Sequence, residues 1–186
     1  MRALAGRSRW TTRANGLTLL RLFMAPALAV ALLEDAPGAA LALFAAAVAT
    51  DLLDGRVARR FGESTPLGGL LDHACDAAFV VVGLGALVWR HEVPALLPVL
   101  VAAAFLQYAV DSRVSAARPL RGSALGRWNG IAYFALLGVP VVRDGLALAI
   151  PPRGVVYALG WLLVASTLVS MGDRLRRAEP RPTRSC

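Results

Sequence analysis

Four aspartates fall within one 26-residue stretch that separates two long apolar runs: Asp51, Asp54, Asp72 and Asp76. The first two are three residues apart and the last two are four apart, so on helices the members of each pair share a face. If two helix ends brought these pairs together, the carboxylates would repel. Two unit charges about 4 Å apart repel by about 4 kcal/mol at an effective dielectric constant near 20. We therefore expect a cation among them.

Two kinds of cation could balance these aspartates. Arg56, Arg59 and Arg60 lie in the same stretch and could form salt bridges that need no ligand. Hard carboxylate oxygens, without histidine or cysteine in a ligand pattern, instead favour Mg²⁺ or Mn²⁺, as one ion or a pair, and such ions commonly bind phosphate. His73 and Cys75 lie between the aspartates on other helix faces, and we expect neither to be a metal ligand.

The elements that position these aspartates are six apolar segments in a chain of 186 residues, of which 57% are hydrophobic. Its mean hydropathy of +0.58 is typical of a polytopic membrane protein. The segments approach the length of a transmembrane helix and lack the alternation of barrel strands. We predict an all-α integral membrane protein with six transmembrane helices. The segments are 17–33, 38–53, 68–89, 93–110, 128–142 and 155–171.

The arginines predict the orientation of these helices. All 20 basic residues are arginine, and sixteen of them lie in the N-terminal arm, the second and fourth connections and the C-terminal tail. The positive-inside rule then places both termini and the aspartates on the cytoplasmic side of the cell membrane. We expect almost no acidic residues at the opposite side. The first segment could also be a cleaved signal peptide, but the apolar segments that follow at once favour a retained helix.

This organisation predicts one catalytic domain and a tail. Residues 1–172 would form a six-helix transmembrane domain that begins with a basic arm at 1–16, and residues 173–186 would form a basic, disordered tail. Gly55 is a residue at which the backbone could turn after the second helix. Pro66 suits the first turn of the third helix, and would place Asp76 about 15 Å along it. A carboxylate at that depth should face the bundle and have a partner.

The spacing of the stretch is also that of a known signature. Its eight fixed positions resemble the DxxDGxxAR motif, followed by G, D and D, of the CDP-alcohol phosphatidyltransferase family. The upstream segment NGLTLLRLFMAP, with Asn15, Thr18, Arg21 and Pro26, is similar to the first span of that family. The eight positions are Asp51, Asp54, Gly55, Ala58, Arg59, Gly68, Asp72 and Asp76.

This resemblance implies a six-helix membrane enzyme, usually a homodimer, that transfers a phosphate-linked alcohol from a CDP-alcohol to a second alcohol and releases CMP. It implies that Asp51, Asp54 and Asp72 are metal ligands, and that Asp76 is both a ligand and the catalytic base. Small residues would leave room for the cytidine nucleotide, with an arginine near its phosphates. These nucleotide-binding positions are Gly55, Ala58, Arg59 and Gly68.

The acceptor alcohol is less well defined by the sequence. Arg113, Arg118 and Arg121 could bind the phosphate of an acceptor such as glycerol 3-phosphate or inositol phosphate, or they could only orient the helices. The role of Asp111 stays open.

Two clues about the donor point in opposite directions. His73, within PLGGLLDHACD, resembles the choline and ethanolamine phosphotransferases, in which diacylglycerol is the acceptor. NGLT with Arg21 instead resembles the phosphatidylglycerophosphate and cardiolipin synthases. We favour CDP-diacylglycerol as donor and a polar alcohol as acceptor, and keep the reversed assignment as an alternative. A non-enzymatic ion transporter is a further alternative, disfavoured because its charges should span the whole membrane depth.

Overall fold

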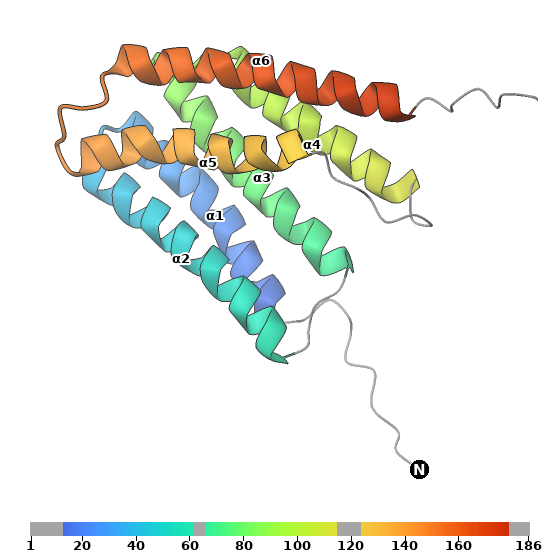
Figure 1. Cartoon of the computed structure of the whole chain (residues 1–186). Helices are drawn as coiled ribbons and strands as arrows, with labels where there is room; N and C mark the ends of the chain where they lie inside the picture. Colours follow the sequence, from blue (N-terminus) through green and yellow to red (C-terminus); the bar gives the residue numbers. More distant parts are fainter. Residues whose placement is uncertain (1–12, 62–65, 115–123, 179–186) are drawn as a thin grey trace, which may run out of the picture.

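The computed structural model describes residues 13–61, 66–114 and 124–178, which form six helices (Figure 1). No strand occurs within these ranges, so the all-α fold class is confirmed there. Successive helices run in opposite directions, and α5 and α6 cross the other four at an angle (Figure 1). The helices are α1 (Arg13–Leu33), α2 (Pro37–Phe61), α3 (Pro66–Trp89), α4 (Leu96–Val114), α5 (Ala124–Gly145) and α6 (Arg153–Ala178).

The helices extend beyond the apolar segments. In particular, α2 continues through Asp51 and Gly55 to Phe61, so the backbone does not turn at Gly55. The third helix does begin at Pro66, as predicted. Proline suits this first position because a helix leaves its first N–H groups unpaired, and proline has none to lose. The aspartates of α2 therefore lie within a continuous helix.

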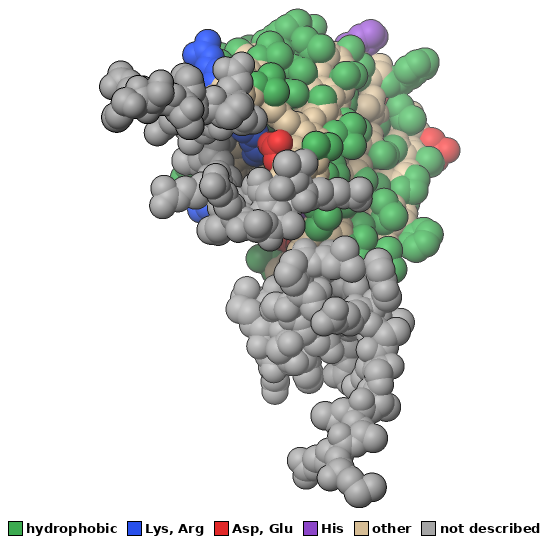
Figure 2. Space-filling model, turned by 90° about the vertical axis from the view of Figure 1, so that its right-hand side faces the viewer, with side chains coloured by type: hydrophobic (Ala, Val, Ile, Leu, Met, Phe, Trp, Pro, Cys, Tyr) green, Lys and Arg blue, Asp and Glu red, His purple; other side chains and the backbone are tan. Residues whose placement is uncertain are grey.

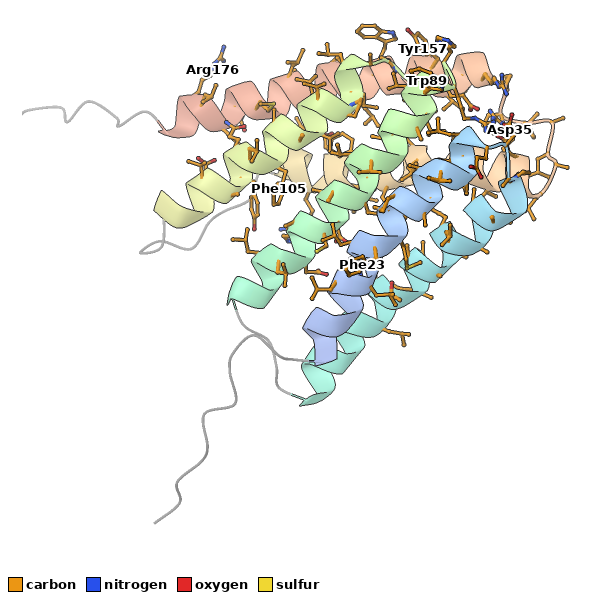
Figure 3. All side chains as sticks on the ribbon, turned by 180° about the vertical axis from the view of Figure 1, so that it is seen from behind. Phe23, Asp35, Trp89, Phe105, Tyr157 and Arg176 are labelled. Carbon is orange, nitrogen blue, oxygen red and sulfur yellow. The ribbon has the colours of Figure 1, made fainter. Side chains whose placement is uncertain are left out.

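On the face that Figure 2 shows, much of the described surface is hydrophobic. Three helical stretches are long and apolar enough to cross a membrane, and they are Gly69–Trp89, Leu125–Gly145 and Arg153–Arg176. The apolar parts of the other three helices are shorter, at Leu19–Leu33, Pro37–Leu53 and Leu96–Asp111. Exposed Trp89 and Tyr157 lie at the same end of the bundle as Asp35 (Figure 3), and such aromatic residues are typical of a membrane interface. A membrane protein is thus supported, and six spans stay a prediction.

The core lies where α1 packs between α2 and α3, with α5 against α2. Three aromatic rings fill its middle. The Phe134 ring lies 5.1 Å from that of Phe44 and 6.0 Å from that of Phe79, measured between centroids. Phe79 comes one helical turn after Asp76, so this cluster lies next to the aspartates along α3.

Helices α1, α3 and α5 end in the same way, at what we call the far end of the bundle. Each is followed by a residue in the left-handed region, with φ of 50° at Asp35, 56° at His91 and 52° at Ala147. In each case the next N–H donates back to a carbonyl five residues earlier, as Glu92 does to Leu87 at 2.9 Å. This C-terminal motif pairs carbonyls that the helix leaves open. The resulting tight turns lie where charged side chains near the ends of α1, α3 and α5 come together.

Those side chains form an ion-pair network at the far end. The fully buried Glu92 accepts a hydrogen bond from Arg143 at 2.8 Å. Arg90 donates to Asp35 at 2.7 Å and to Asp144 at 2.9 Å. Acidic residues therefore lie at both ends of the bundle, and the expectation that the outer end has almost none was wrong. That expectation failed because these acids lie far apart in the sequence, near the ends of three different helices.

Candidate metal and phosphate site

The apolar stripes of three helices each continue into a charged residue at the other end of the bundle, which we call the site end. In α1 the buried face carries Leu32, Leu28 and Ala25, and then Arg21. In α2 it carries Ala40, Phe44 and Ala47, and then Asp51. In α3 it carries Leu87, Leu84, Val80 and Phe79, and then Asp76 and Asp72. Because these faces pack together in the core, the charged residues meet where the stripes end.

Arg21 lies at the centre of this meeting point. Its Nη2 is 3.2 Å from Asp51 Oδ1, and its Nη1 is 3.4 Å from Asp72 Oδ1. The same Nη1 also donates to Asp76. Arg21 is fully buried, whereas the three carboxylate side chains are 48%, 32% and 33% exposed, in chain order. The guanidinium therefore lies on the buried side of the site, and the carboxylates are partly exposed to the surroundings of the protein.

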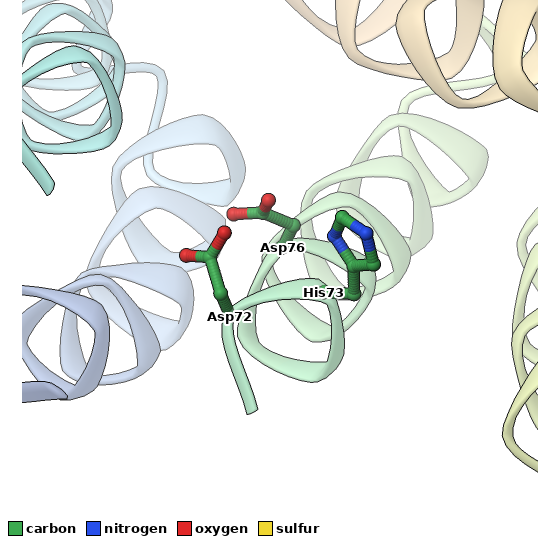
Figure 4. Close-up of side chains that lie close together, drawn as sticks. All are labelled: Asp72, His73 and Asp76. Atoms are coloured by element: carbon green, nitrogen blue, oxygen red, sulfur yellow. The ribbon is translucent and has the colours of Figure 1, made fainter. Parts of the chain in front are cut away.

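Asp72 and Asp76 turn their carboxylates to one side of α3, whereas the ring of His73 turns away from them (Figure 4). Each of the three residues still offers one ligand atom within 4.8 Å of the others. The His73 ring also packs edge-on against Tyr108 of α4, with 5.9 Å between centroids. The His73 ring thus lies closer to the two carboxylates than we expected from its position on another face of the helix. Its packing against Tyr108 of α4 explains why the ring turns away from them.

The charge balance of the site differs from that of the far end. In the described contacts of Arg21, three carboxylates face one guanidinium, which leaves a formal charge of −2. At the far end, three acids face the three arginines Arg90, Arg143 and Arg153, and the charges balance. An excess of partly exposed carboxylate oxygens is the donor set that Mg²⁺ and Mn²⁺ prefer. The residues present therefore fit a hard divalent cation.

Several predicted site residues lie outside what the structure describes. Asp54, Gly55, Ala58 and Arg59 belong to α2 and Gly68 to α3, but their side chains are not described. The same holds for Arg113 of α4, and Arg118 and Arg121 fall between the described ranges. Of the four predicted ligands, the structure thus brings together Asp51, Asp72 and Asp76. Asp111 is half-buried near the end of α4.

The partner of these aspartates was not predicted. We considered Arg56, Arg59 and Arg60 because they are close in sequence, whereas Arg21 precedes Asp51 by 30 residues and Asp72 by 51. A signal was present, since Arg21 interrupts an otherwise apolar segment at 17–33. A charged residue within a membrane span is expected to face the bundle and to have a partner.

Comparison with known proteins adds an independent finding. A family model described as CDP-alcohol phosphatidyltransferase matches residues 11–170. This range includes Arg21 and all four aspartates. No solved structure matches the chain significantly.

Curated relatives carry related names. A probable phosphatidylglycerophosphate synthase of Mycobacterium tuberculosis is 35% identical over 133 residues, which cover 68% of this chain and 62% of the relative. A CDP-diacylglycerol–glycerol-3-phosphate 3-phosphatidyltransferase of Pseudomonas fluorescens is 51% identical, over 28% of this chain and 27% of the relative. A CMP-forming cardiolipin synthase of Streptomyces coelicolor is 40% identical, over 31% and 26%. The chain thus spans less than two thirds of the length of these relatives.

Proposed function

Because this chain belongs to the CDP-alcohol phosphatidyltransferase family, we propose that it transfers a phosphatidyl group from CDP-diacylglycerol to a polar alcohol and releases CMP. The acceptor class is a polyol or its phosphate, such as glycerol 3-phosphate. The observation that carries this proposal is the convergence of Asp51, Asp72 and Asp76, from two helices, on one point at the bundle end. Those are three of the positions at which the family signature predicts ligands and base.

The three described aspartates have two proposed roles. Asp51, Asp72 and Asp76, with Asp54, would hold Mg²⁺ or Mn²⁺, and Asp76 would also act as the base. When bound, such an ion supplies positive charge that stabilises the diphosphate as its P–O bond breaks. Asp76 is the aspartate furthest along α3 from the site end, and as base it would accept the proton of the acceptor hydroxyl. A base must lie within hydrogen-bond reach of that hydroxyl, and the 33% exposure of Asp76 leaves such access.

The nucleotide and acceptor positions complete the proposed site. Gly55, Ala58 and Gly68 would leave space for the cytidine nucleotide, and Arg59 would contact its phosphates. Arg113, Arg118 and Arg121 would bind an acceptor phosphate, since a guanidinium forms paired hydrogen bonds with phosphate oxygens.

A lipid-linked donor is supported by an apolar groove between α2 and α5. The groove has a volume of about 500 Å³, and Phe44, Val48, Phe134 and Val142 are among the residues that line it. Val48 lies one helical turn from Asp51 on α2, so an acyl chain in the groove would start beside the site. The names of the relatives favour the same donor. The contact of His73 with Tyr108 gives that histidine a packing role and weakens the one clue for a reversed donor.

The membrane setting belongs to the same proposal. We place all six helices across the cell membrane, with both termini and the site end on the cytoplasmic side, where arginine-rich connections are retained. A CDP-lipid would then have its diphosphate at the interface and its chains in the bilayer. A homodimer, as the family resemblance implies, completes the proposed assembly.

The function is tested by supplying purified full-length protein with Mg²⁺ and CDP-diacylglycerol and measuring the CMP released with each of several acceptors. Glycerol 3-phosphate, glycerol and inositol phosphate form the first panel. CDP-choline with diacylglycerol tests the reversed assignment. We expect CMP only with CDP-diacylglycerol and one of the polar alcohols. CMP release from CDP-choline alone would overturn the donor assignment, and no release from either donor would overturn the function.

A further inference from the structure

The Arg21 guanidinium contacts the three aspartates that the proposed metal site would use. We propose that Arg21 is a built-in counter-ion of this site: it holds the carboxylates of α2 and α3 together before metal binds, and it competes with the divalent ion for them. The inference rests on the proposed metal site and adds a residue that weakens metal affinity.

The contacts of Arg21 suit a counter-ion that joins two helices. Its two terminal nitrogens are divided between them, with Nη2 on Asp51 of α2 and Nη1 on Asp72 and Asp76 of α3. In the described contacts the cation comes from a third helix, α1. A planar guanidinium can make both sets of contacts at once, whereas a lysine ammonium offers one point of charge.

The exposure pattern indicates how metal and arginine would share the site. Arg21 is fully buried and reaches the carboxylates from inside the bundle. The carboxylates are between 32% and 48% exposed, so an ion would approach them from the opposite side. Oxygens that contact Arg21 have to be shared with the ion or released to it. Removing the arginine would thus remove a repulsive positive charge and free those oxygens.

Arg90 at the far end provides a matched comparison. It also contacts three acids, Asp35, Glu92 and Asp144, and is 15% exposed. Among the side chains that the structure describes, the acids around Arg90 are balanced by further arginines, whereas those around Arg21 outnumber it. Arg90 is therefore a purely structural partner, and metal should not substitute for it.

The experiment compares full-length Arg21→Gln, Arg21→Lys and Arg90→Gln with the wild type in detergent. Two readouts need no turnover: the midpoint of thermal unfolding in EDTA and in saturating Mn²⁺, and the Mn²⁺ dissociation constant from electron paramagnetic resonance of the free ion. We expect Arg21→Gln to unfold at lower temperature in EDTA, to recover most of that loss in Mn²⁺, and to bind Mn²⁺ at least about tenfold more tightly, which corresponds to about 1.4 kcal/mol.

The other two variants separate charge from structure. Arg21→Lys keeps the positive charge but loses the fork and so frees some of the carboxylate oxygens. It should bind Mn²⁺ more tightly than the wild type and less tightly than Arg21→Gln, and its stabilisation by Mn²⁺ should lie between theirs. Arg90→Gln should lose the same stability with and without Mn²⁺ and keep the wild-type dissociation constant. If Arg21→Gln does not fold in EDTA, Arg21→Lys alone still tests the rescue by Mn²⁺.

Unchanged or weaker Mn²⁺ binding by Arg21→Gln would overturn the inference, as would a stability loss in both Arg21 variants that Mn²⁺ does not relieve. The wild-type preparation is assayed in parallel for CMP release. Release of CMP together with no gain in Mn²⁺ affinity would overturn the role of Arg21 and leave the proposed function standing. Tighter Mn²⁺ binding without CMP release from any donor would support the role of Arg21 and overturn the function.

Discussion

Asp76 has the most specific chemical task that we assign to a single residue. Its carboxylate is held by a buried guanidinium on one side and is partly exposed on the other. A group so placed is fixed in position and still reachable by a hydroxyl. Substitutions at this residue should therefore affect the reaction far more than the fold.

We expect Asp76→Asn to reduce CMP release by at least about 100-fold, because general-base catalysis typically contributes about 10² to 10⁴ in rate and asparagine cannot accept the proton. The variant should stay a folded helical protein by circular dichroism. Asp35→Asn at the far end, where the side chain is 84% exposed, is the matched control and should release CMP at the wild-type rate. Normal turnover by Asp76→Asn would contradict the base assignment.

The arginines between α4 and α5 allow a second test. If Arg118 and Arg121 bind an acceptor phosphate, alanine substitution of both should raise the KM for glycerol 3-phosphate about tenfold or more and leave the KM for an unphosphorylated polyol unchanged. Initial rates at varied acceptor concentration measure both constants. An equal effect on both acceptors, or none on either, would assign these arginines to topology alone.

How much of the site the sequence predicts depends on sequence separation. The four aspartates stand out because their spacing repeats within a few residues, on two helices that share one connection. The contacts of Arg21 with these aspartates cannot be predicted in this way, because they join residues 30 or more positions apart and depend on how three helix faces pack. Local periodicity shows on which face of its helix a residue lies. Which residues of other helices contact that face depends on the tertiary structure.

At the scale of helices, close contacts at glycine fix how the elements pack. A Cβ added to Gly160 of α6 would lie 2.5 Å from Cδ of Pro94, in the connection before α4. The proline ring is stiff, so one of the two segments would have to move. Gly154 in the same helix has nothing within 4 Å of such a Cβ.

Gly160→Ala should therefore destabilise the protein by about 1–3 kcal/mol, the usual cost of overpacking. Gly154→Ala should be neutral or stabilising by up to about 1 kcal/mol, because alanine favours the helix more than glycine does. Thermal unfolding in detergent measures both variants. Equal stability of the two would show that α6 does not pack against Pro94 as described.

The helix ends show where an apolar pattern stops being informative. All six helices overlap the predicted segments, and the start of α3 at Pro66 follows from the chemistry of proline. The extension of α2 to Phe61 was missed because the apolar run ends near Leu53, while backbone hydrogen bonding continues through charged residues. Hydrophobicity marks the part of a helix that packs or meets lipid, and a helix can be longer than that part.

At the scale of the whole molecule, described charged side chains are clustered at the site end and at the far end of the bundle, and we assign the two ends different roles. Asp76 and Trp89 are 13 residues apart on α3, or about 20 Å along its axis. Glu92 lies just beyond, in the balanced network. We expect the far end to govern stability and the site end to govern chemistry.

Glu92→Gln tests this division. The substitution removes a buried charge that contacts Arg143 at 2.8 Å, and breaking such a pair typically costs about 3–5 kcal/mol. Thermal unfolding should shift markedly downward, while CMP release per folded molecule stays at the wild-type level. Asp35→Asn, exposed to solvent, should cost far less. A fall in turnover without a fall in stability would mean that the two ends are coupled.

The position of Arg21 also bears on how the protein is made. A ribosome delivers α1 to the membrane before α2 and α3, so in the proposed topology Arg21 arrives ahead of every aspartate that neutralises it. An arginine at the centre of a transmembrane helix costs about 2.5–3.5 kcal/mol on insertion scales, and Arg21, near the start of the apolar part Leu19–Leu33, would cost a part of that. An isolated α1 should accordingly insert less efficiently than the same segment with Arg21→Leu, and adding α2 and α3 should remove the difference. The first helix would then depend, for its stable place in the bilayer, on helices synthesised after it.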